Sequence, residues 1–171
     1  MSGRIILIRH AETEGNKTRY VGREDLPLDA AGEQQARDLE LALRDLEIDI
    51  IFSSPMKRAL ATAGPLALQR GLAIRQHPGL MEIDYGELQG NVKGEKPFNL
   101  RRKYFDTPMP GGESLRNVWE RLHGASGEIL ASLREHACVA IVGHYWTNRL
   151  LASQLIGRTL ETSLDKGGYR P

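Results

Sequence analysis

The stretch Leu7-Ile8-Arg9-His10-Ala11-Glu12-Thr13-Glu14-Gly15-Asn16 decides the fold of this chain. The apolar run at residues 5–8 is typical of a short buried strand, and it ends at a cation and an imidazole. In open α/β sheets, ligands bind just beyond the carboxyl ends of the strands. A neutral imidazole can act as a nucleophile at pH 7, and a guanidinium can hold a phosphoryl oxygen. Arg9 and His10 therefore indicate a site, with two solvated polar residues at a strand end as the plain alternative.

Three further apolar runs occur at residues 48–53, 72–74 and 138–143. Each is followed by a residue capable of catalytic chemistry, as the first run is by His10; these residues are Arg58, Glu82 and His144. The carboxyl ends of parallel strands lie at one edge of a sheet, where α/β proteins bind their ligands. The four residues are therefore expected to converge.

Four segments have apolar residues at helical spacing, and several begin with a capping residue. The predicted helices cover residues 30–46, 55–69, 114–135 and 147–156. Asp29 and Ser114 are expected to cap two of them, and Ser54 is expected to cap the helix that has Pro55 at its first position. Alternating strands and helices predict the α/β class, as a three-layer sandwich with a mostly parallel central sheet flanked by helices. A length of 171 residues suits a single domain over residues 1–171.

Residues 84–113 do not share this periodicity. The segment is rich in Gly, Pro, Lys and Arg. Long irregular connections in compact domains are often binding loops or lids. The segment is therefore predicted to be a lid or substrate segment in which Arg101 and Arg102 bind substrate, although a solvated basic turn explains these residues equally well.

The composition excludes several classes of protein. Hydrophobic residues make up 40% and charged residues 26%, and the net charge of +1 argues against a nucleic-acid partner. No apolar run is long enough for a membrane helix, and the first residues do not resemble a signal peptide, so the cytoplasm is the expected compartment. The five histidines include no pair at metal-ligand spacing with supporting carboxylates, so no metal and no cofactor is expected.

Motifs along nearly the whole chain resemble those of the histidine phosphatase superfamily, in its phosphoglycerate mutase-like branch. In chain order they are Arg9-His10 with Thr13 and Asn16; Asp25-Leu26-Pro27-Leu28 with Gly32; Ser53-Ser54-Pro55 with Arg58; Glu82 with Tyr85-Gly86; Pro110-Gly111-Gly112-Glu113-Ser114; and Gly143-His144 with Arg149. The resemblance implies a phosphoglycerate mutase-like fold and a phosphomonoester hydrolase that acts on a small phosphorylated metabolite.

The resemblance also implies a role for each matching residue. His10 would be the nucleophile that forms a phosphohistidine, and Glu82 would be the general acid and then the base. Arg9 and Arg58 would bind the phosphoryl oxygens, with a cationic His144 as a further donor. Asn16 would contact the phosphate pocket.

Three features depart from the family pattern. Ala11 replaces the usual glycine after the first histidine, and alanine reaches positive φ less readily. Tyr145 and Trp146 replace small residues after the second histidine, and Tyr145 is expected at the pocket mouth, against either the substrate or the following helix. Residues 160–171 offer only a weak final strand, so the sheet is smaller here or a second copy of the chain covers its edge as a homodimer.

Alternative functions remain open at this stage. A phosphoglycerate mutase is the first alternative, and the shortness of the chain argues for hydrolysis over it. An α-ribazole phosphate phosphatase is also compatible with the Pro-Gly-Gly-Glu-Ser turn. A non-catalytic phosphate-binding module is the alternative from another class, and the presence of the four core residues argues against it.

Overall fold

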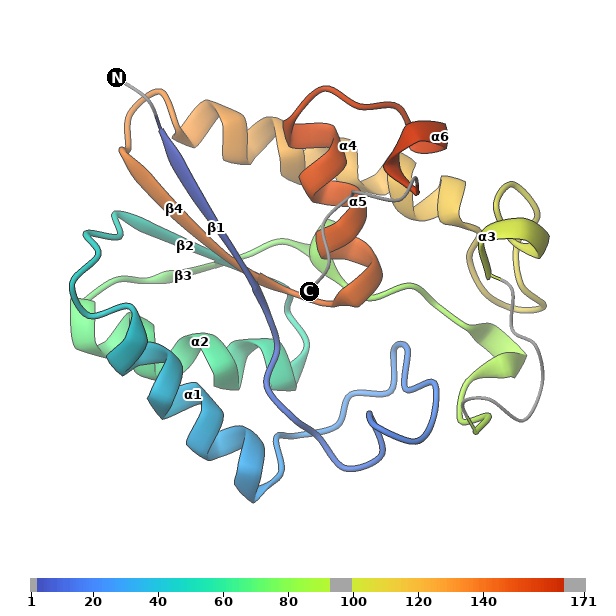
Figure 1. The fold of residues 1–171 in the computed structure, drawn as a ribbon, viewed down its shortest axis with the longest axis horizontal. Helices are drawn as coiled ribbons and strands as arrows, with labels where there is room; N and C mark the ends of the chain where they lie inside the picture. Colours follow the sequence, from blue (N-terminus) through green and yellow to red (C-terminus); the bar gives the residue numbers. More distant parts are fainter. Residues whose placement is uncertain (1–2, 93–99, 165–171) are drawn as a thin grey trace.

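A computed structural model describes residues 3–92 and 100–164 of the chain. Its centre is a four-stranded sheet whose strands are β1 (Arg4–Arg9), β2 (Ile50–Ser53), β3 (Ile74–Gln76) and β4 (Cys138–Gly143). The strand order is β1-β4-β2-β3, and every pairing is parallel (Figure 1). The predicted α/β class with a parallel sheet is confirmed, and β3 lies two residues further along than expected.

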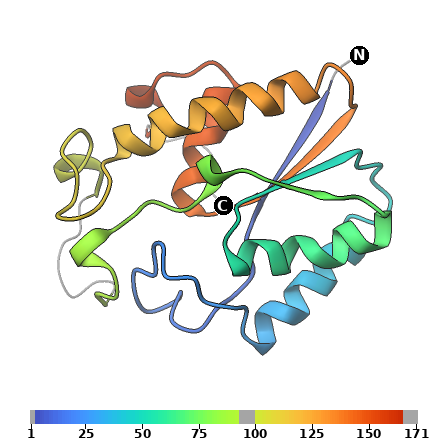
Figure 2. The ribbon, with the colours of Figure 1, turned by 180° about the vertical axis from the view of Figure 1, so that it is seen from behind.

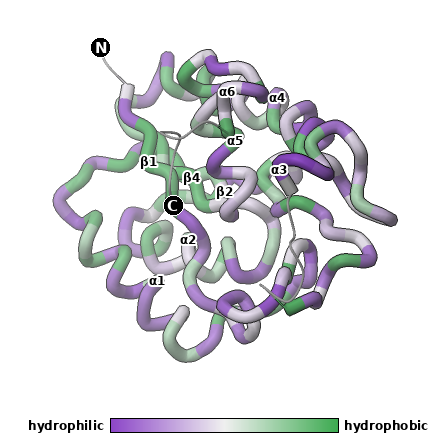
Figure 3. Tube along the Cα trace, turned by 45° about the vertical axis from the view of Figure 1, so that its right-hand side comes forward, coloured by the Kyte–Doolittle hydropathy of each residue, from purple (hydrophilic) through white to green (hydrophobic). Residues whose placement is uncertain are grey.

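Helices cover both faces of the sheet, which makes the predicted three layers. Helices α1 (Ala30–Ala42) and α2 (Lys57–Arg70) lie below the sheet in Figure 1, and α4 (Leu115–Ser132) and α5 (Tyr145–Leu155) lie above it. Strands β1, β2 and β4 form a mainly hydrophobic centre of the trace (Figure 3).

Alternate residues of the strands build two separate cores. Ile51 and Val142 pack in the cluster that includes Leu66 of α2, whereas Phe52 and Ile141 pack in the cluster that includes Leu122 of α4. Because side chains of a strand point to opposite faces in turn, an uninterrupted apolar run is what a sheet buried on both faces requires.

The helix starts follow the predicted caps in two cases. The Asp29 side chain accepts from the Gly32 backbone N–H, and Ser114 forms a capping box with Asn117. The helices end earlier than predicted, α1 at Ala42 and α4 at Ser132.

The predicted cap of α2 is wrong. The helix begins at Lys57 after Met56, which makes no side-chain cap bond, so Arg58 is the second helical residue and lies at the positive end of the helix. The Ser54 hydroxyl accepts from the Met56 backbone N–H at 3.3 Å, before the helix begins, and lies 2.8 Å from Nε2 of His144. The serine therefore makes a local turn bond and also contacts the buried imidazole.

The predicted irregular region holds short elements only. They are η2 (Gly86–Leu88) and α3 (Leu100–Lys103), while η1 (Pro78–Leu80) precedes the region and residues 93–99 lie outside the described part. The prediction of a weak strand after residue 160 is wrong for Leu160–Ser163, because these residues form α6, a helical turn capped by Thr159. Among the described residues, no helix has both the length and the apolar character to cross a membrane.

The loop after β1 pairs with the segment after η2. Arg19 and Val92 form an isolated antiparallel bridge, and the Tyr20 backbone exchanges hydrogen bonds with Gly90 and Asn91 at 2.8 and 3.0 Å. These two segments lie side by side beyond the carboxyl ends of the strands (Figure 2). The loop after β1 forms one wall of the cavity described next.

Candidate active site

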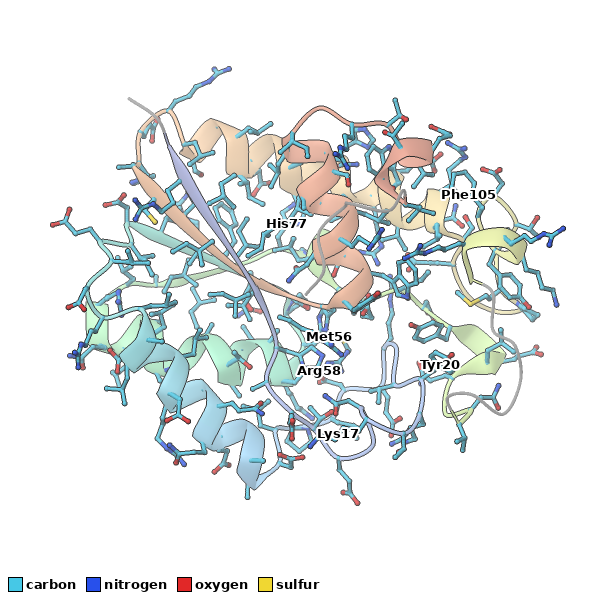
Figure 4. The ribbon with its side chains drawn as sticks, viewed as in Figure 1. Lys17, Tyr20, Met56, Arg58, His77 and Phe105 are labelled. Carbon is cyan, nitrogen blue, oxygen red and sulfur yellow. The ribbon has the colours of Figure 1, made fainter. Side chains whose placement is uncertain are left out.

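A cavity of about 500 Å³ opens beyond the carboxyl ends of the strands. Its walls include three of the four residues that the sequence predicted to converge, His10, Arg58 and Glu82, and they include Arg9 as well. His144 is fully buried behind this wall, with its ring centroid 5.0 Å from that of His10. Figure 4 shows Arg58 and Tyr20 at this end of the sheet, where β1 passes into its long loop. The parallel sheet therefore brings the predicted core residues together.

His10 is held as a neutral imidazole with one defined proton position. Its backbone N–H donates to the Gly143 carbonyl at 2.9 Å, which continues the β1–β4 ladder past the strand end. Its Nδ1–H donates to the Ala11 carbonyl at 2.7 Å, so the lone pair resides on Nε2. Burial, with the positive charges of Arg58 and Arg9, lowers the pKa of His10 to about 3. The imidazole is therefore unprotonated at Nε2 near neutral pH, as a nucleophile must be.

Ala11 does not strain the backbone after His10. No residue other than glycine has a positive φ in the described part of the chain, so the glycine of the family pattern is not needed here for its conformation. The Ala11 N–H donates to the Thr62 hydroxyl at 2.9 Å, and that hydroxyl donates to the Arg58 carbonyl at 2.7 Å. Alanine therefore fits the backbone at this position without strain.

His144 has one ring nitrogen bonded and one without a partner. Nε2 meets the Ser54 hydroxyl, while the buried Nδ1 has no hydrogen-bond partner among the described residues. Burial, with Arg58 as the largest charge contribution, lowers the pKa of His144 well below its ordinary value. Both effects favour the neutral form of the His144 imidazole. A buried polar atom without a protein partner is typical of a position that a ligand completes.

Arg58 is anchored by main-chain carbonyls. Its Nη1 donates to the Glu24 carbonyl at 2.6 Å and its Nη2 to the Gly22 carbonyl at 2.7 Å, and only 1% of the residue is exposed. Its buried Nε has no partner among the described residues. Arg9 is exposed at the other side of the cavity, with its guanidinium carbon 5.6 Å from the centre of the Tyr145 ring. The two cations approach the cavity from different elements.

Glu82 has the electrostatics of a proton donor. It is 7% exposed, and burial raises the pKa of its carboxyl above the ordinary value. The Ile83 and Trp146 backbone N–H groups donate to the carboxyl at 2.9 Å and 3.2 Å and oppose that rise. Because Trp146 lies in the first turn of α5, the carboxyl is held at the positive end of that helix.

The substrate residues predicted from sequence divide into two groups. Asn16, Arg101 and Tyr145 line the cavity, and the Arg101 guanidinium carbon lies 5.9 Å from the Trp146 ring centre. Arg102 is exposed and is not among the described lining residues, so a substrate role for it stays a prediction. Neighbouring residues of a short helix point in different directions, and α3 is only four residues long.

Several residues that line the cavity were not predicted as site residues from the sequence. They are Arg19, Tyr20, Val21, Gly22 and Tyr85. The Tyr20 and Tyr85 ring centroids lie 5.3 Å apart, and this pair joins the two loops that flank the cavity. Only Tyr85 had a signal, as part of the Tyr85-Gly86 motif; the others lie in a loop without periodicity. Within residues 3–92 and 100–164, no three His, Cys, Asp or Glu side chains gather as a metal site would require.

Comparison with known proteins agrees with this geometry. Residues 5–166 match the family model described as histidine phosphatase superfamily, branch 1. The chain belongs to the histidine phosphatase superfamily. The chain is a histidine-dependent phosphatase of this superfamily.

Relatives of this histidine phosphatase carry different names. It is 33% identical to phosphoserine phosphatase 1 of Hydrogenobacter thermophilus, covering 90% of this chain and 76% of that protein. It is 34% identical to the 2,3-bisphosphoglycerate-dependent phosphoglycerate mutase of Cytophaga hutchinsonii, covering 88% of this chain and 76% of the mutase. A mycobacterial glucosyl-3-phosphoglycerate phosphatase has the same fold, with a TM-score of 0.84, 27% identity, and coverage of 98% of this chain and 86% of that one.

The neutral state of His10 gives a prediction that needs no substrate. In ¹⁵N-histidine NMR spectra recorded from about pH 5 to about pH 8, His10 should remain neutral with its proton on Nδ1, because its folded-state pKa of about 3 lies below this range. An ordinary surface histidine should titrate near 6.5 in the same spectra. Titration of His10 between pH 6 and 7 would contradict the assignment.

Proposed function

We propose that this histidine phosphatase hydrolyses the phosphomonoester of a small phosphorylated metabolite through a phosphohistidine intermediate. The observation that carries the proposal is the pairing of His10, neutral with Nε2 unprotonated, with Glu82, a buried carboxyl of raised pKa, on the walls of one cavity. A nucleophile and a proton donor are the two groups that phosphomonoester cleavage needs besides a cationic pocket.

In the first step, Nε2 of His10 attacks phosphorus, and the bond between phosphorus and the alcohol oxygen breaks. Arg58 and Arg9 stabilise the charge on the phosphoryl oxygens by hydrogen bonds to their guanidinium groups. The Glu82 carboxyl donates its proton to the departing alkoxide, which leaves as a neutral alcohol. The Ala11 carbonyl accepts a hydrogen bond from the Nδ1–H of His10. This bond stabilises the positive charge that the attack creates on the imidazole.

In the second step, water attacks phosphorus of the phosphohistidine. The Glu82 carboxylate left by the first step accepts a proton from that water. The bond between Nε2 and phosphorus breaks, inorganic phosphate leaves, and His10 and Glu82 return to their starting states. His144, whose ring centroid lies 5.0 Å from that of His10, is the further donor to the phosphoryl group in both steps.

Phosphoglycerate mutase is the second candidate, because one of the similar proteins carries that name. The chain covers 76% of both that mutase and the phosphoserine phosphatase, so length does not distinguish the two activities. A mutase must retain its substrate while the phosphohistidine persists, whereas a phosphatase must admit water. Direct assays of both reactions separate them.

We propose that the cavity walls beyond the phosphate pocket bind the alcohol part of the substrate. Asn16 lies beside His10 in the lining, and Tyr145 and Arg101 lie on the side of α5 and α3. We place the small metabolite there, and infer a cytoplasmic enzyme without nucleic-acid or membrane partners. A second copy of the chain is a candidate cover for β1, which pairs only with β4 in the described part.

The nucleophile is tested by trapping the intermediate. Acid-quenched wild-type protein, mixed with ³²P-labelled phosphomonoester, should carry acid-labile label on His10. His10→Ala should lose turnover by at least about 10³-fold, since the nucleophile itself is removed, while its melting temperature stays close to that of the wild type. Label on serine or aspartate, or substantial turnover by His10→Ala, would contradict the mechanism. The same preparation, assayed for phosphate release and for 3- to 2-phosphoglycerate conversion, decides between hydrolase and mutase.

The general acid is tested by changing the leaving group. Glu82→Gln keeps the shape of the side chain but cannot give up a proton, so hydrolysis of alkyl phosphates should fall by about 10²–10⁴-fold. Hydrolysis of 4-nitrophenyl phosphate should fall much less, because nitrophenolate departs without a proton. Steady-state rates on both substrates measure the difference. Equal losses would give Glu82 a different role.

The substrate role of Arg101 has a built-in control in its neighbour. Arg101→Ala should raise KM about tenfold for substrates that carry a carboxylate next to the phosphate, since a charge-assisted hydrogen bond is lost at a partly solvated position. Arg102→Ala removes the same charge outside the cavity and should leave KM within about twofold of wild type. Equal effects of the two substitutions would show that only net charge matters.

A further inference from the structure

The main chain of Glu82 is held from the side opposite its carboxyl. While the carboxyl accepts from Ile83 and Trp146, the main-chain carbonyl accepts from Nε of Arg23 at 3.2 Å and from Nη2 of Arg121 at 3.1 Å. Arg121 also donates from Nη1 to the Gly79 carbonyl at 2.6 Å. Two guanidinium groups thus fix the segment that carries the acid.

Glu113 is the carboxylate that joins these two arginines. Its Oε1 accepts from Nη2 of Arg23 at 2.9 Å and from Nε of Arg121 at 2.8 Å. Its Oε2 accepts from Nη2 of Arg121 at 3.2 Å and from the backbone N–H of Asp84 at 3.0 Å. The Glu113 side chain is 17% exposed, so these contacts are only partly screened by water. Without this carboxylate, the guanidinium groups of Arg23 and Arg121 would both lie at the Glu82 carbonyl with no carboxylate joining them. Asp84 would remain 3.9 Å from Arg23.

The glycines before Glu113 allow this approach. A Cβ atom on Gly112 would lie 2.5 Å from the Asp84 carbonyl oxygen, and one on Gly86 would lie 2.1 Å from the Pro110 carbonyl oxygen. Gly86 also has a φ of 52°, which favours glycine. The backbone N–H of Glu113 donates to the Asp84 carbonyl at 2.9 Å. The Pro-Gly-Gly-Glu turn is therefore packed directly against the segment that follows Glu82.

Arg23 also links this network to the phosphate pocket. It lies between Gly22 and Glu24, whose carbonyls accept from Arg58. The three-residue segment 22–24 thus binds Arg58 through its main chain and the Glu82 segment through the Arg23 side chain. Arg23 therefore connects the segment that carries the proton donor with the segment that binds the phosphate-binding cation.

We propose that Glu113 is a positioning residue for protonation of the leaving group: by binding Arg23 and Arg121 together, it fixes the Glu82 main chain and places the Glu82 carboxyl relative to Arg58. This inference rests on the proposed role of Glu82 as general acid. Glu113 itself does not line the cavity, so it acts through its neighbours and touches no substrate. Small displacements of a catalytic group can reduce rates by about 10²-fold, so a network of this kind has a measurable effect.

The test is the leaving-group dependence of Glu113→Gln. This substitution keeps the size of the side chain but removes the charge and brings an N–H₂ group toward the arginine donors. Hydrolysis of an alkyl phosphate should fall by about 10- to 100-fold, and hydrolysis of 4-nitrophenyl phosphate by less than about threefold. Glu120→Gln, a matched change at an exposed position of α4, should alter neither rate. If Glu113→Gln fails to fold, Arg121→Lys carries the same test, because lysine keeps the charge and loses the forked contacts.

A double variant separates positioning from general structural damage. In a Glu82→Gln background, Glu113→Gln should cause no further selective loss on the alkyl phosphate, because no acid remains to be positioned. Equal losses on both substrates, or a selective loss that persists in the Glu82→Gln background, would overturn the inference. If Glu82→Gln is selective and Glu113→Gln is not, this inference alone fails. If Glu82→Gln is itself not selective, the acid role fails and this inference fails with it.

Discussion

The buried guanidinium of Arg58 is the charge on which the rest of the site depends. It is 1% exposed, and the carbonyls of Gly22 and Glu24 accept hydrogen bonds from its two Nη atoms but do not neutralise its charge. Its field adds to the effect of burial in lowering the pKa of both His10 and His144. A buried charge of this kind is costly unless it is compensated. The compensation that the fold leaves open is an anion in the cavity, which is what a phosphomonoester supplies.

This charge balance also explains why His144 differs from its expected state. The resemblance to the family predicts a cationic second histidine, whereas burial and the charge of Arg58 lower the pKa of His144 and favour the neutral imidazole. A phosphoryl dianion placed beside His144 acts in the opposite direction and raises its pKa, since an opposite charge favours the protonated form. The two descriptions belong to different states of one site. The cost of protonating a buried imidazole is met when the substrate arrives, so binding and charging of His144 are coupled.

The shifted pKa values of His10 and Glu82 also affect the stability of the fold. Because the folded-state pKa of His10 lies below its unfolded value of about 6.5, the unfolded chain binds more protons than the folded one in mildly acidic solution. Stability contributed by this group is therefore full above the unfolded pKa and declines as the pH falls from there toward the folded pKa of about 3. Glu82 acts at the other side, because its raised pKa makes the ionised carboxyl unfavourable in the folded state as the pH rises. The shifted pKa values of His10 and Glu82 thus lower the free energy of unfolding, and the two apolar cores of the sheet offset this loss.

The sequence predicted those parts of the site that depend on topology and missed those that depend on loop packing. His10, Arg58, Glu82 and His144 could be found because each follows an apolar run, and a parallel sheet brings such positions to one edge. Ser54 was assigned to a helix cap, because sequence shows its proline neighbour but not the imidazole 90 residues away that contacts its hydroxyl. Arg101 and Arg102 could not be told apart, since the direction of each side chain is set by α3, a helix too short to show a period. Tyr20 and Arg19 could not be predicted for a related reason: their loop pairs with residues 90–92, which are far away in the sequence.

The Pro-Gly-Gly-Glu-Ser turn is intermediate between these cases. Its residues were recognised by resemblance, but the physical need for two glycines and a carboxylate became clear only where the turn meets Asp84 and the arginines. Loops that position catalytic groups are built from long-range contacts, and such contacts leave no periodic pattern along a chain.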